Sequence, residues 1–262
     1  MILKLDSLQN PLVKKISKLI SSRSLRYEEG LFVIEGQRLS MDAVKSNVSI
    51  EKCLFTADFA KKHPDDLALI QSVAESLVEI SKSVADKISD TQNPQGIFCL
   101  CRIDKKDFAL QQGSRYIALE NIQDPSNLGT IARTAEALGA QGLILSRNCC
   151  DVYNPKVLRG SMGAFFRLPF IVADDFCAYL KSAQKSGFQI MATSPDSNCE
   201  DISKCEKSES LIAIIGNEGD GITKEAFDCA DSTVTIKMRG RAESLNASAA
   251  AAIVMYEVLK QG

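Results

Sequence analysis

The sequence has few of the residues on which several kinds of site depend. Histidine occurs once, at His63, and none of the nine cysteines stands in a CxxC pair. Zinc sites are built from closely spaced Cys and His residues, so the sequence predicts no metal centre. A catalytic scheme that needs a second histidine is excluded. The cysteines are expected to be small buried side chains in a reducing compartment.

Long apolar runs and a strong charge of one sign are also missing. No apolar stretch approaches the roughly 20 residues that span a membrane, and the first residues lack the hydrophobic segment and cleavage site of a signal peptide. The formal net charge is −2. Any contact with nucleic acid must therefore be local, because the chain has no bulk basicity. We expect a cytoplasmic protein with no membrane contact.

The length of the chain favours two domains. A chain of 262 residues is long for a single core. Residues 104–114 contain two polar clusters, Asp104-Lys105-Lys106-Asp107 and Gln111-Gln112-Gly113-Ser114, which are typical of a linker. We therefore predict a smaller domain at residues 1–103, a linker at 104–114 and a larger domain at 115–262.

Short strand and helix signals alternate through residues 1–103 and predict a small α/β unit. Helices are predicted from about residue 11, at 37–45 and near 65–74 and 82–89, and strands at 31–34, 53–55 and 96–101.

The most basic stretch of the chain lies in residues 1–27, where a single acid, Asp6, stands against several cations: Lys4, Lys14, Lys15, Lys18, Arg23 and Arg26. Such a run is either the solvated face of a helix or a surface that contacts RNA phosphates. The sequence alone leaves both possibilities open.

From residue 115 onward, apolar strands alternate with helices in a regular way. Strands are predicted at 116–120, 142–146, 168–172, 188–193, 211–215 and 234–236, and helices at 128–138, 155–162, 174–185, 224–229 and 245–260. Such alternation predicts a parallel sheet with helices on both faces. Ligands of these sheets bind beyond the carboxyl ends of the strands.

Three polar loops fall at those strand ends. The first leads into a helix that carries Asn127 and Arg133, and the helical period places Arg133 opposite the apolar stripe. The second, residues 215–221, contains three glycines but matches neither the dinucleotide fingerprint nor the P-loop. The third precedes an almost uncharged helix, and Ser244 is predicted to cap the first turn of that helix. A nicotinamide-dependent oxidoreductase is disfavoured because its phosphate fingerprint is absent.

Together the three loops resemble the three motifs of the SPOUT-class RNA 2′-O-ribose methyltransferases, in the SpoU (TrmH-like) branch. The residues that carry this resemblance are Asn127 with Arg133, then Gly216-Asn217-Glu218-Gly219, then Ser244-Leu245-Asn246. It covers about residues 114–260. Residues 1–102, with NPLVKKISKL and FVIEGQRL, more loosely resemble the L30e-like substrate-binding domain of several such enzymes. Lys237 and Asn217 depart from residues common in the family.

The resemblance implies a fold that periodicity could not predict, in which the C-terminal part forms a deep trefoil knot. It also implies an S-adenosylmethionine site and a homodimer. The implied cofactor-binding residues are Thr193, Gly216, Ile236, Leu245 and Asn246. The implied catalytic residues are Arg133, Asn127, Glu218, Ser244 and Asn246. The basic residues Lys14, Lys15, Lys18, Arg23 and Arg26 are the candidates for RNA contact.

The implied reaction is methylation of a ribose 2′-hydroxyl in RNA, with ribosomal RNA as the expected substrate. A guanidinium keeps its proton up to a pKa above about 12, so Arg133 is a poor general base. We expect it to orient the target phosphate and to lower the pKa of the 2′-hydroxyl through its charge. Transfer RNA as substrate, and a non-catalytic RNA-binding protein that retains the fold, are the alternatives.

Overall fold

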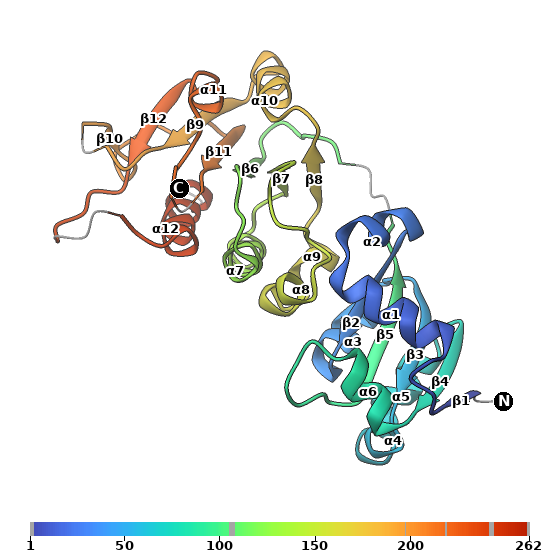
Figure 1. Ribbon diagram of the computed structural model, residues 1–262. Coiled ribbons are helices and arrows are strands. Elements are labelled where there is room, and N and C mark those ends of the chain that lie inside the picture. The colour runs from blue at the N-terminus through green and yellow to red at the C-terminus, as the bar shows by residue number, and fades with distance from the viewer. Residues whose placement is uncertain (1–2, 105–107, 197, 218, 241–243, 261–262) are drawn as a thin grey trace. The chain divides into compact units, whose positions relative to one another are not determined.

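The computed structural model describes residues 3–104, 108–196, 198–217, 219–240 and 244–260 (Figure 1). They form two compact units. Unit 1 is the described part of Met1–Lys106 together with Asp151–Phe166, and unit 2 is the described part of Asp107–Cys150 together with Arg167–Gly262. This geometric division differs from the predicted one, because residues 151–166 group with unit 1. The boundaries 1–103 and 115–262, as functional domains, stay a prediction.

Unit 1 contains a mixed five-stranded sheet in the order β1-β4-β3-β5-β2. Strands β1, β4 and β3 are parallel, whereas β5 runs antiparallel to both β3 and β2. The strands are β1 (Leu3–Leu5), β2 (Leu31–Glu35), β3 (Ile50–Phe55), β4 (Ser76–Ile80) and β5 (Ile97–Arg102). The helices are α1 (Pro11–Ser21), α2 (Arg23–Glu29), α3 (Gln37–Lys45), α4 (Ala57–Lys62), α5 (Pro64–Gln71), α6 (Lys82–Ile88) and α8 (Pro155–Ser161), with α9 (Ala164–Arg167) at the division between the units.

Helix α1 shows why the basic stretch is helical. The side chain of Asn10 accepts a hydrogen bond from the Leu12 backbone N–H, and Pro11 occupies the first turn, where its missing N–H costs nothing. Val13, Ile16 and Leu19 recur at helical spacing and are buried. The predicted helix from Pro11 is confirmed, and its lysines are left on the outer face.

Unit 2 contains a seven-stranded sheet in the order β10-β12-β9-β11-β6-β7-β8, and all its strand pairs are parallel. The predicted α/β class with a parallel sheet is confirmed. The strands are β6 (Arg115–Leu119), β7 (Leu143–Ser146), β8 (Phe170–Ala173), β9 (Gln189–Thr193), β10 (Glu200–Asp201), β11 (Leu211–Ile215) and β12 (Ser232–Thr235). The helices are α7 (Pro125–Ala137), α10 (Phe176–Lys185), α11 (Lys224–Phe227) and α12 (Ala247–Leu259).

Helices cover both faces of this sheet because alternate strand residues point to opposite sides. Tyr116 and Ala118 of β6 join a buried cluster with residues of α10 and α11. On the other face, α12 packs against α7 and against β11 and β6 (Figure 1). Both faces of the central strands are thereby covered, and the carboxyl edge of the sheet is left for loops.

Candidate active site

The carboxyl ends of four neighbouring strands meet at one edge of the sheet in unit 2. Ile215 of β11 pairs with Leu119 of β6, and Thr193 of β9 pairs with Val234 of β12. All four strands run in the same direction, so the loops that follow them lie at the same edge. Helix α12 begins close to these loops, and together they enclose a cavity.

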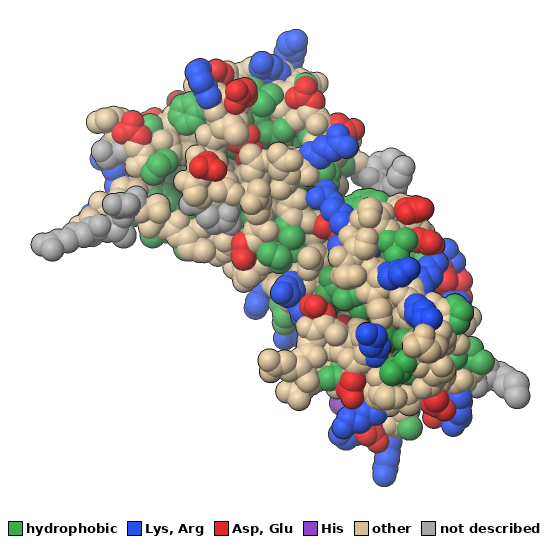
Figure 2. Space-filling model, in the orientation of Figure 1, with side chains coloured by type: hydrophobic (Ala, Val, Ile, Leu, Met, Phe, Trp, Pro, Cys, Tyr) green, Lys and Arg blue, Asp and Glu red, His purple; other side chains and the backbone are tan. Residues whose placement is uncertain are grey.

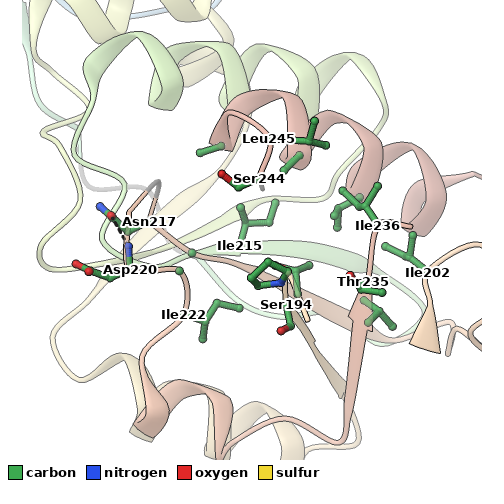
Figure 3. Close-up of a pocket in the computed structure, with 18 of the residues that line it drawn as sticks. Ser194, Ile202, Ile215, Asn217, Asp220, Ile222, Thr235, Ile236, Ser244 and Leu245 are labelled. Carbon is green, nitrogen blue, oxygen red and sulfur yellow. Dashed lines mark hydrogen bonds between the residues drawn. The ribbon is translucent and has the colours of Figure 1, made fainter. Parts of the chain in front are cut away.

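The cavity has a volume of about 280 Å³ (Figure 3). Its walls come from the residues after β9, β11 and β12 and from the first turns of α12. The lining includes Thr193, Ser194, Pro195, Ile202, Ile215, Gly216, Asn217, Asp220, Ile222, Phe227, Thr235, Ile236, Met238, Ser244, Leu245 and Val254. Apolar side chains therefore alternate with backbone and hydroxyl groups that can form hydrogen bonds, as in sites for small organic molecules.

The structure brings together four of the five predicted cofactor residues, which come from different loops. Thr193, Gly216, Ile236 and Leu245 all line the cavity, whereas Asn246 does not belong to the lining. The Thr193 hydroxyl donates a hydrogen bond to the Ile214 carbonyl at 2.9 Å, which fixes its side chain against β11.

Gly216 is the residue at which the backbone comes closest to another part of its own loop. A Cβ atom at this position would lie 2.2 Å from the carbonyl carbon of Gly221 and 2.4 Å from the backbone nitrogen of Ile222. Both contacts are with backbone, so no side chain can move away to make room. The absence of a side chain at Gly216 is therefore required for the loop to close over the cavity.

Asn217 holds the same loop through its side chain. Its Oδ1 accepts hydrogen bonds from the backbone N–H of Gly219 at 2.8 Å and of Asp220 at 3.3 Å. Its Nδ2 donates to the Asn121 carbonyl at 2.8 Å. The backbones of Asn217 and Gly221 also exchange two hydrogen bonds. Figure 3 shows Asn217 and Asp220 at one end of the cavity.

The predicted cap of the last helix is corrected by the structure. Ser244 was expected to cap it, but the N-cap is Asn246, whose Oδ1 accepts from Ser248 N at 2.9 Å and Ala249 N at 3.3 Å. A carboxamide accepts these two bonds as well as a hydroxyl does, and α12 therefore starts at Ala247, after Leu245. Ser244 instead lines the cavity.

Asn246 also connects two of the predicted motifs. Its Nδ2 donates a hydrogen bond to Oδ1 of Asn127 at 3.1 Å, across 119 positions of the sequence. Asn127 lies in the first turn of α7, which begins three residues before the predicted start because Asp124 accepts hydrogen bonds from Ser126 N and Asn127 N. The first and third motifs therefore meet at the starts of two packed helices.

Arg133 lies two turns further along α7 and is exposed. Its guanidinium makes no hydrogen bond or ion pair with another described residue, and it is not part of the cavity lining. A solvated guanidinium with five donors is available for a phosphate group. The predicted catalytic residue Glu218 lies outside the described residues.

The structure separates the five predicted RNA-binding residues into two kinds. Lys14, Lys18 and Arg23 are exposed, and Lys15 is partly exposed and forms an ion pair with Glu29 at 2.6 Å. Figure 2 shows Lys and Arg side chains on the surface formed by α1 and α2.

Arg26 is different, because its side chain is buried and 2% exposed. Its Nε donates to Oδ2 of Asp151 at 2.7 Å, and its Nη1 donates to the Leu19 and Ile20 carbonyls. The Tyr27 hydroxyl donates to the same carboxylate at 3.0 Å, and burial together with Asp151 raises the pKa of Tyr27 well above its ordinary value. The predicted RNA contact of Arg26 is therefore replaced by a buried ion pair within unit 1.

Several residues at this edge were not predicted from the sequence. Glu120 and Asn121 form hydrogen bonds with Thr223 and Asn217 of the loop after β11. Ser194 and Ile202 line the cavity. Their positions directly after strands could have identified Glu120, Asn121 and Ser194, because such positions face the ligand edge. Ile202 reaches the cavity only through the tertiary fold, for which the sequence gives no local signal.

Two kinds of feature are missing from the part of the chain that the structure describes. No group of three or more His, Cys, Asp or Glu residues is arranged to hold a metal ion. No helix among the same residues is long and apolar enough to span a membrane.

The fold and this site define a class: α/β proteins that hold a small ligand at the carboxyl edge of a parallel sheet, beneath the start of a C-terminal helix. Within it, the sequence matches the SpoU rRNA Methylase family over residues 114–256 and the MRM3-like substrate binding domain over residues 10–99. The chain belongs to the SpoU rRNA methylase family. The resemblance described from the three motifs is thereby confirmed.

Known proteins resemble the chain over almost its full length. An uncharacterized tRNA/rRNA methyltransferase of Synechocystis is 32% identical, with 98% of this chain and 93% of the relative covered. The 23S rRNA (guanosine(2553)-2′-O)-methyltransferase RlmP of Bacillus subtilis is 29% identical, with 97% and 98% covered. The crystal structure of an AdoMet-bound rRNA methyltransferase from Sinorhizobium meliloti has a TM-score of 0.86 at 29% identity, with 98% and 97% covered.

Proposed function

We propose that this protein transfers a methyl group from S-adenosylmethionine to a ribose 2′-hydroxyl of ribosomal RNA. The observation that carries the proposal is the cavity at the carboxyl edge of unit 2, where the three motif loops meet and where Asn246 is bonded to Asn127. The Bacillus relative is named for 2′-O-methylation of 23S rRNA, and the Sinorhizobium relative binds AdoMet. Both match nearly the whole chain.

The residues of the cavity fit S-adenosylmethionine. The Ile215, Ile222 and Val254 side chains offer apolar contact for a flat base. Gly216, where a Cβ would collide with the backbone of Gly221, lets the loop fold tightly enough to form one wall of the cavity. When bound, the cofactor supplies a methyl group on a positively charged sulfur. The residues proposed to hold it are Thr193, Gly216, Ile236 and Leu245, with Asn246 fixing the helix above them.

The reaction requires that the ribose hydroxyl be oriented and made more acidic. Arg133 is proposed to bind the phosphate beside the target ribose, and its positive charge favours the deprotonated hydroxyl. The hydrogen bond between Asn127 and Asn246 holds the starts of α7 and α12 together. It is proposed to fix the position of Arg133, which lies on α7, relative to the cavity. Ser244 and Glu218 complete the proposed catalytic set.

Recognition of the RNA is assigned to unit 1. Lys14, Lys15, Lys18 and Arg23 on α1 and α2 are proposed to contact RNA phosphates, and Arg26 is left out because it is buried. The match to an MRM3-like substrate binding domain over residues 10–99 supports this assignment. Phosphate contacts of this kind add affinity without sequence preference.

Assembly, location and chain topology belong to the same proposal. Ala249, Ile253 and Tyr256 lie on one exposed side of α12, and Ile253 and Tyr256 are 40% and 61% exposed. This apolar strip is proposed to pack against a second copy of the chain in a homodimer. The trefoil knot in unit 2 stays a prediction from the resemblance, and the cytoplasm is proposed because ribosomal RNA is the proposed substrate.

The experiment combines cofactor binding with mapping of the product. Calorimetry on the purified protein should detect binding of S-adenosylmethionine and no binding of NAD. Mapping of 2′-O-methyl groups in ribosomal and transfer RNA, from cells with and without the protein, should show one or more ribosomal sites that depend on it. Cofactor binding with no protein-dependent methyl group in any RNA would favour the non-catalytic alternative, and a site in transfer RNA would change the substrate.

A further inference from the structure

Two consecutive residues at the carboxyl end of β6 hold the two ends of the glycine loop that follows β11. We define this cofactor loop by its described residues, 216, 217 and 219–223. The two residues are Glu120 and Asn121, and neither lines the cavity. They bond to opposite ends of the loop, 217 on one side and 223 on the other.

Glu120 holds the far end. Its side chain is buried, with 5% of the residue exposed, and both carboxylate oxygens accept hydrogen bonds from Thr223: Oε2 from the backbone N–H at 2.8 Å and Oε1 from the hydroxyl at 2.6 Å. The Thr223 hydroxyl oxygen in turn accepts from Ala226 N and caps α11. Glu120 forms no ion pair with another described residue. Two hydrogen bonds to one buried carboxylate hold Thr223 firmly in place.

Asn121 holds the near end. Its carbonyl accepts a hydrogen bond from Nδ2 of Asn217 at 2.8 Å. The carbonyl has this direction because Asn121 adopts a left-handed conformation with φ of 56°, which asparagine tolerates better than most residues. That conformation is supported by Ser146, whose hydroxyl donates to Oδ1 of Asn121 at 3.1 Å and accepts from the Asn121 backbone N–H at 2.9 Å.

Inside the loop, Asn217 bonds to the backbones of Gly219, Asp220 and Gly221, but three of the loop residues are glycines. Gly216, Gly219 and Gly221 each allow many backbone conformations, so an unrestrained loop would spend only part of its time in the binding conformation. The apparent dissociation constant of a ligand rises in proportion as the binding-competent fraction falls. Residues that restrain the loop therefore increase affinity without touching the ligand.

The geometry points to Glu120 as a positioning residue for the cofactor, acting through Thr223, with Asn121 as its counterpart at the other end of the loop. This inference rests on the proposed function, because it concerns affinity for S-adenosylmethionine at the same cavity. It predicts that Glu120 sets the KM for the cofactor and has little effect on kcat, since the loop binds ground state and transition state alike.

The test is calorimetric titration of the full chain and its variants with S-adenosylmethionine, together with steady-state methylation of ribosomal RNA from cells that lack the protein. Glu120→Ala should raise the Kd and the KM for the cofactor about tenfold, with kcat changed less than about twofold. Thr223→Val keeps the backbone N–H bond to Glu120 but removes the hydroxyl bond to Glu120 and the cap bond from Ala226 N, and it should give a smaller rise. Thr223→Ser keeps both bonds and should restore the wild-type value.

The matched control is Glu35→Ala in unit 1. Glu35 is also a buried glutamate, 8% exposed, and it also holds a loop, accepting hydrogen bonds from Ser89, Asp90 and Thr91. Its loss should lower the melting temperature but leave the Kd for the cofactor unchanged. Hydrogen exchange should become faster at the amides of Gly219 and Gly221 in Glu120→Ala and remain as in wild type in Glu35→Ala.

The outcomes separate this inference from the function on which it rests. Wild-type protein that binds no S-adenosylmethionine overturns the proposed function and the inference with it. If the wild-type protein binds S-adenosylmethionine and both Glu120→Ala and Thr223→Val bind it equally well, the inference alone is overturned. If Glu120→Ala does not fold, Thr223→Val and its Thr223→Ser counterpart decide. An equal loss of affinity in Glu35→Ala would show a general effect of stability and would also overturn it.

Discussion

Both units are built from helices packed on a β-sheet, but they differ in the direction of their strands and in the location of their charged residues. In unit 2 all strand pairs are parallel, so the loops after β9, β11 and β12 gather at one edge and line a cavity made mostly of uncharged groups, with Asp220 among them. In unit 1, β5 runs antiparallel to its neighbours, and Lys14, Lys18 and Arg23 are exposed on α1 and α2. Ligand binding in unit 2 therefore depends on the shape of the cavity. RNA binding by the exposed cations of unit 1 would depend on charge and would weaken as the salt concentration rises.

The largest effect is expected at Arg26, and it tests whether this residue belongs with the exposed cations of α1 and α2. Arg26→Ala should destabilise the protein by about 3–5 kcal/mol, because it leaves the buried Asp151 carboxylate without its partner. Urea unfolding measures the change. The double variant Arg26→Met with Asp151→Leu removes both charges and should recover most of the loss. An Arg26→Ala protein of nearly wild-type stability but weaker RNA binding would return Arg26 to the binding surface.

The next effect concerns the exposed cation of unit 2. Arg133→Ala should lower kcat by about 10²–10³ while leaving the Kd for S-adenosylmethionine nearly unchanged, since Arg133 does not line the cavity. Single-turnover methylation with saturating cofactor measures it. Arg133→Lys keeps the charge but loses the planar fork, and it should recover only part of the rate. Lys181→Ala, on the exposed side of α10, is the control and should be as fast as wild type.

A smaller effect is expected from the cations of unit 1. The triple variant Lys14→Ala, Lys18→Ala and Arg23→Ala should raise the KM for RNA with kcat nearly unchanged. Each lost phosphate contact should reduce the slope of log affinity against log salt by roughly 0.7–0.9. Filter binding of the RNA across a salt series gives the slope.

The matched control for this charge change is the double variant Lys61→Ala and Lys62→Ala, which removes two exposed cations from α4 in the same unit. It should leave the slope as in wild type. If both variants changed the slope equally per charge, the effect would come from net charge, and the α1 and α2 surface would have no special role.

The smallest effect is expected at the exposed strip of α12. Light scattering should give about twice the chain mass of 28.5 kDa. Tyr256→Ala should weaken dimerisation by about 1 kcal/mol or more, as for an aromatic residue at an interface. Val73→Ala, at an apolar position of unit 1 that is 48% exposed, should leave the mass unchanged on dilution. A monomer at micromolar concentration for the wild type would contradict the homodimer.

Local signals in the sequence predicted many elements well. The helix Gln37–Lys45 and the strand Leu211–Ile215 have the predicted bounds, because hydrophobic periodicity and flanking glycines mark them. The break between α1 and α2 was not predicted, since the stretch from Pro11 reads as one helical pattern and the start of α2 is set by a single cap, Ser22. Strand β1 is three residues long and exists through its pairing with β4, which no local pattern reveals.

The site was predictable where a motif stands in sequence and unpredictable where it depends on a distant partner. Gly216 and Leu245 could be assigned to the cavity from the resemblance. The burial of Arg26 could not, because it depends on Asp151, which lies 125 positions away. The choice of Asn246 over Ser244 as the helix cap was also open, because both residue types favour that position.

The hydrogen bond between Asn127 and Asn246 has a consequence for the order in which the molecule matures. At roughly 5–20 residues per second, the ribosome makes Asn127 about 6–24 s before Asn246. The walls of the cavity extend to Val254, so a nascent chain that has the Arg133 helix and most of the sheet still has no pocket to close. Binding of a small molecule can thus begin only after these long-range contacts have formed, and a bound ligand would report that the chain has been made at least as far as Val254.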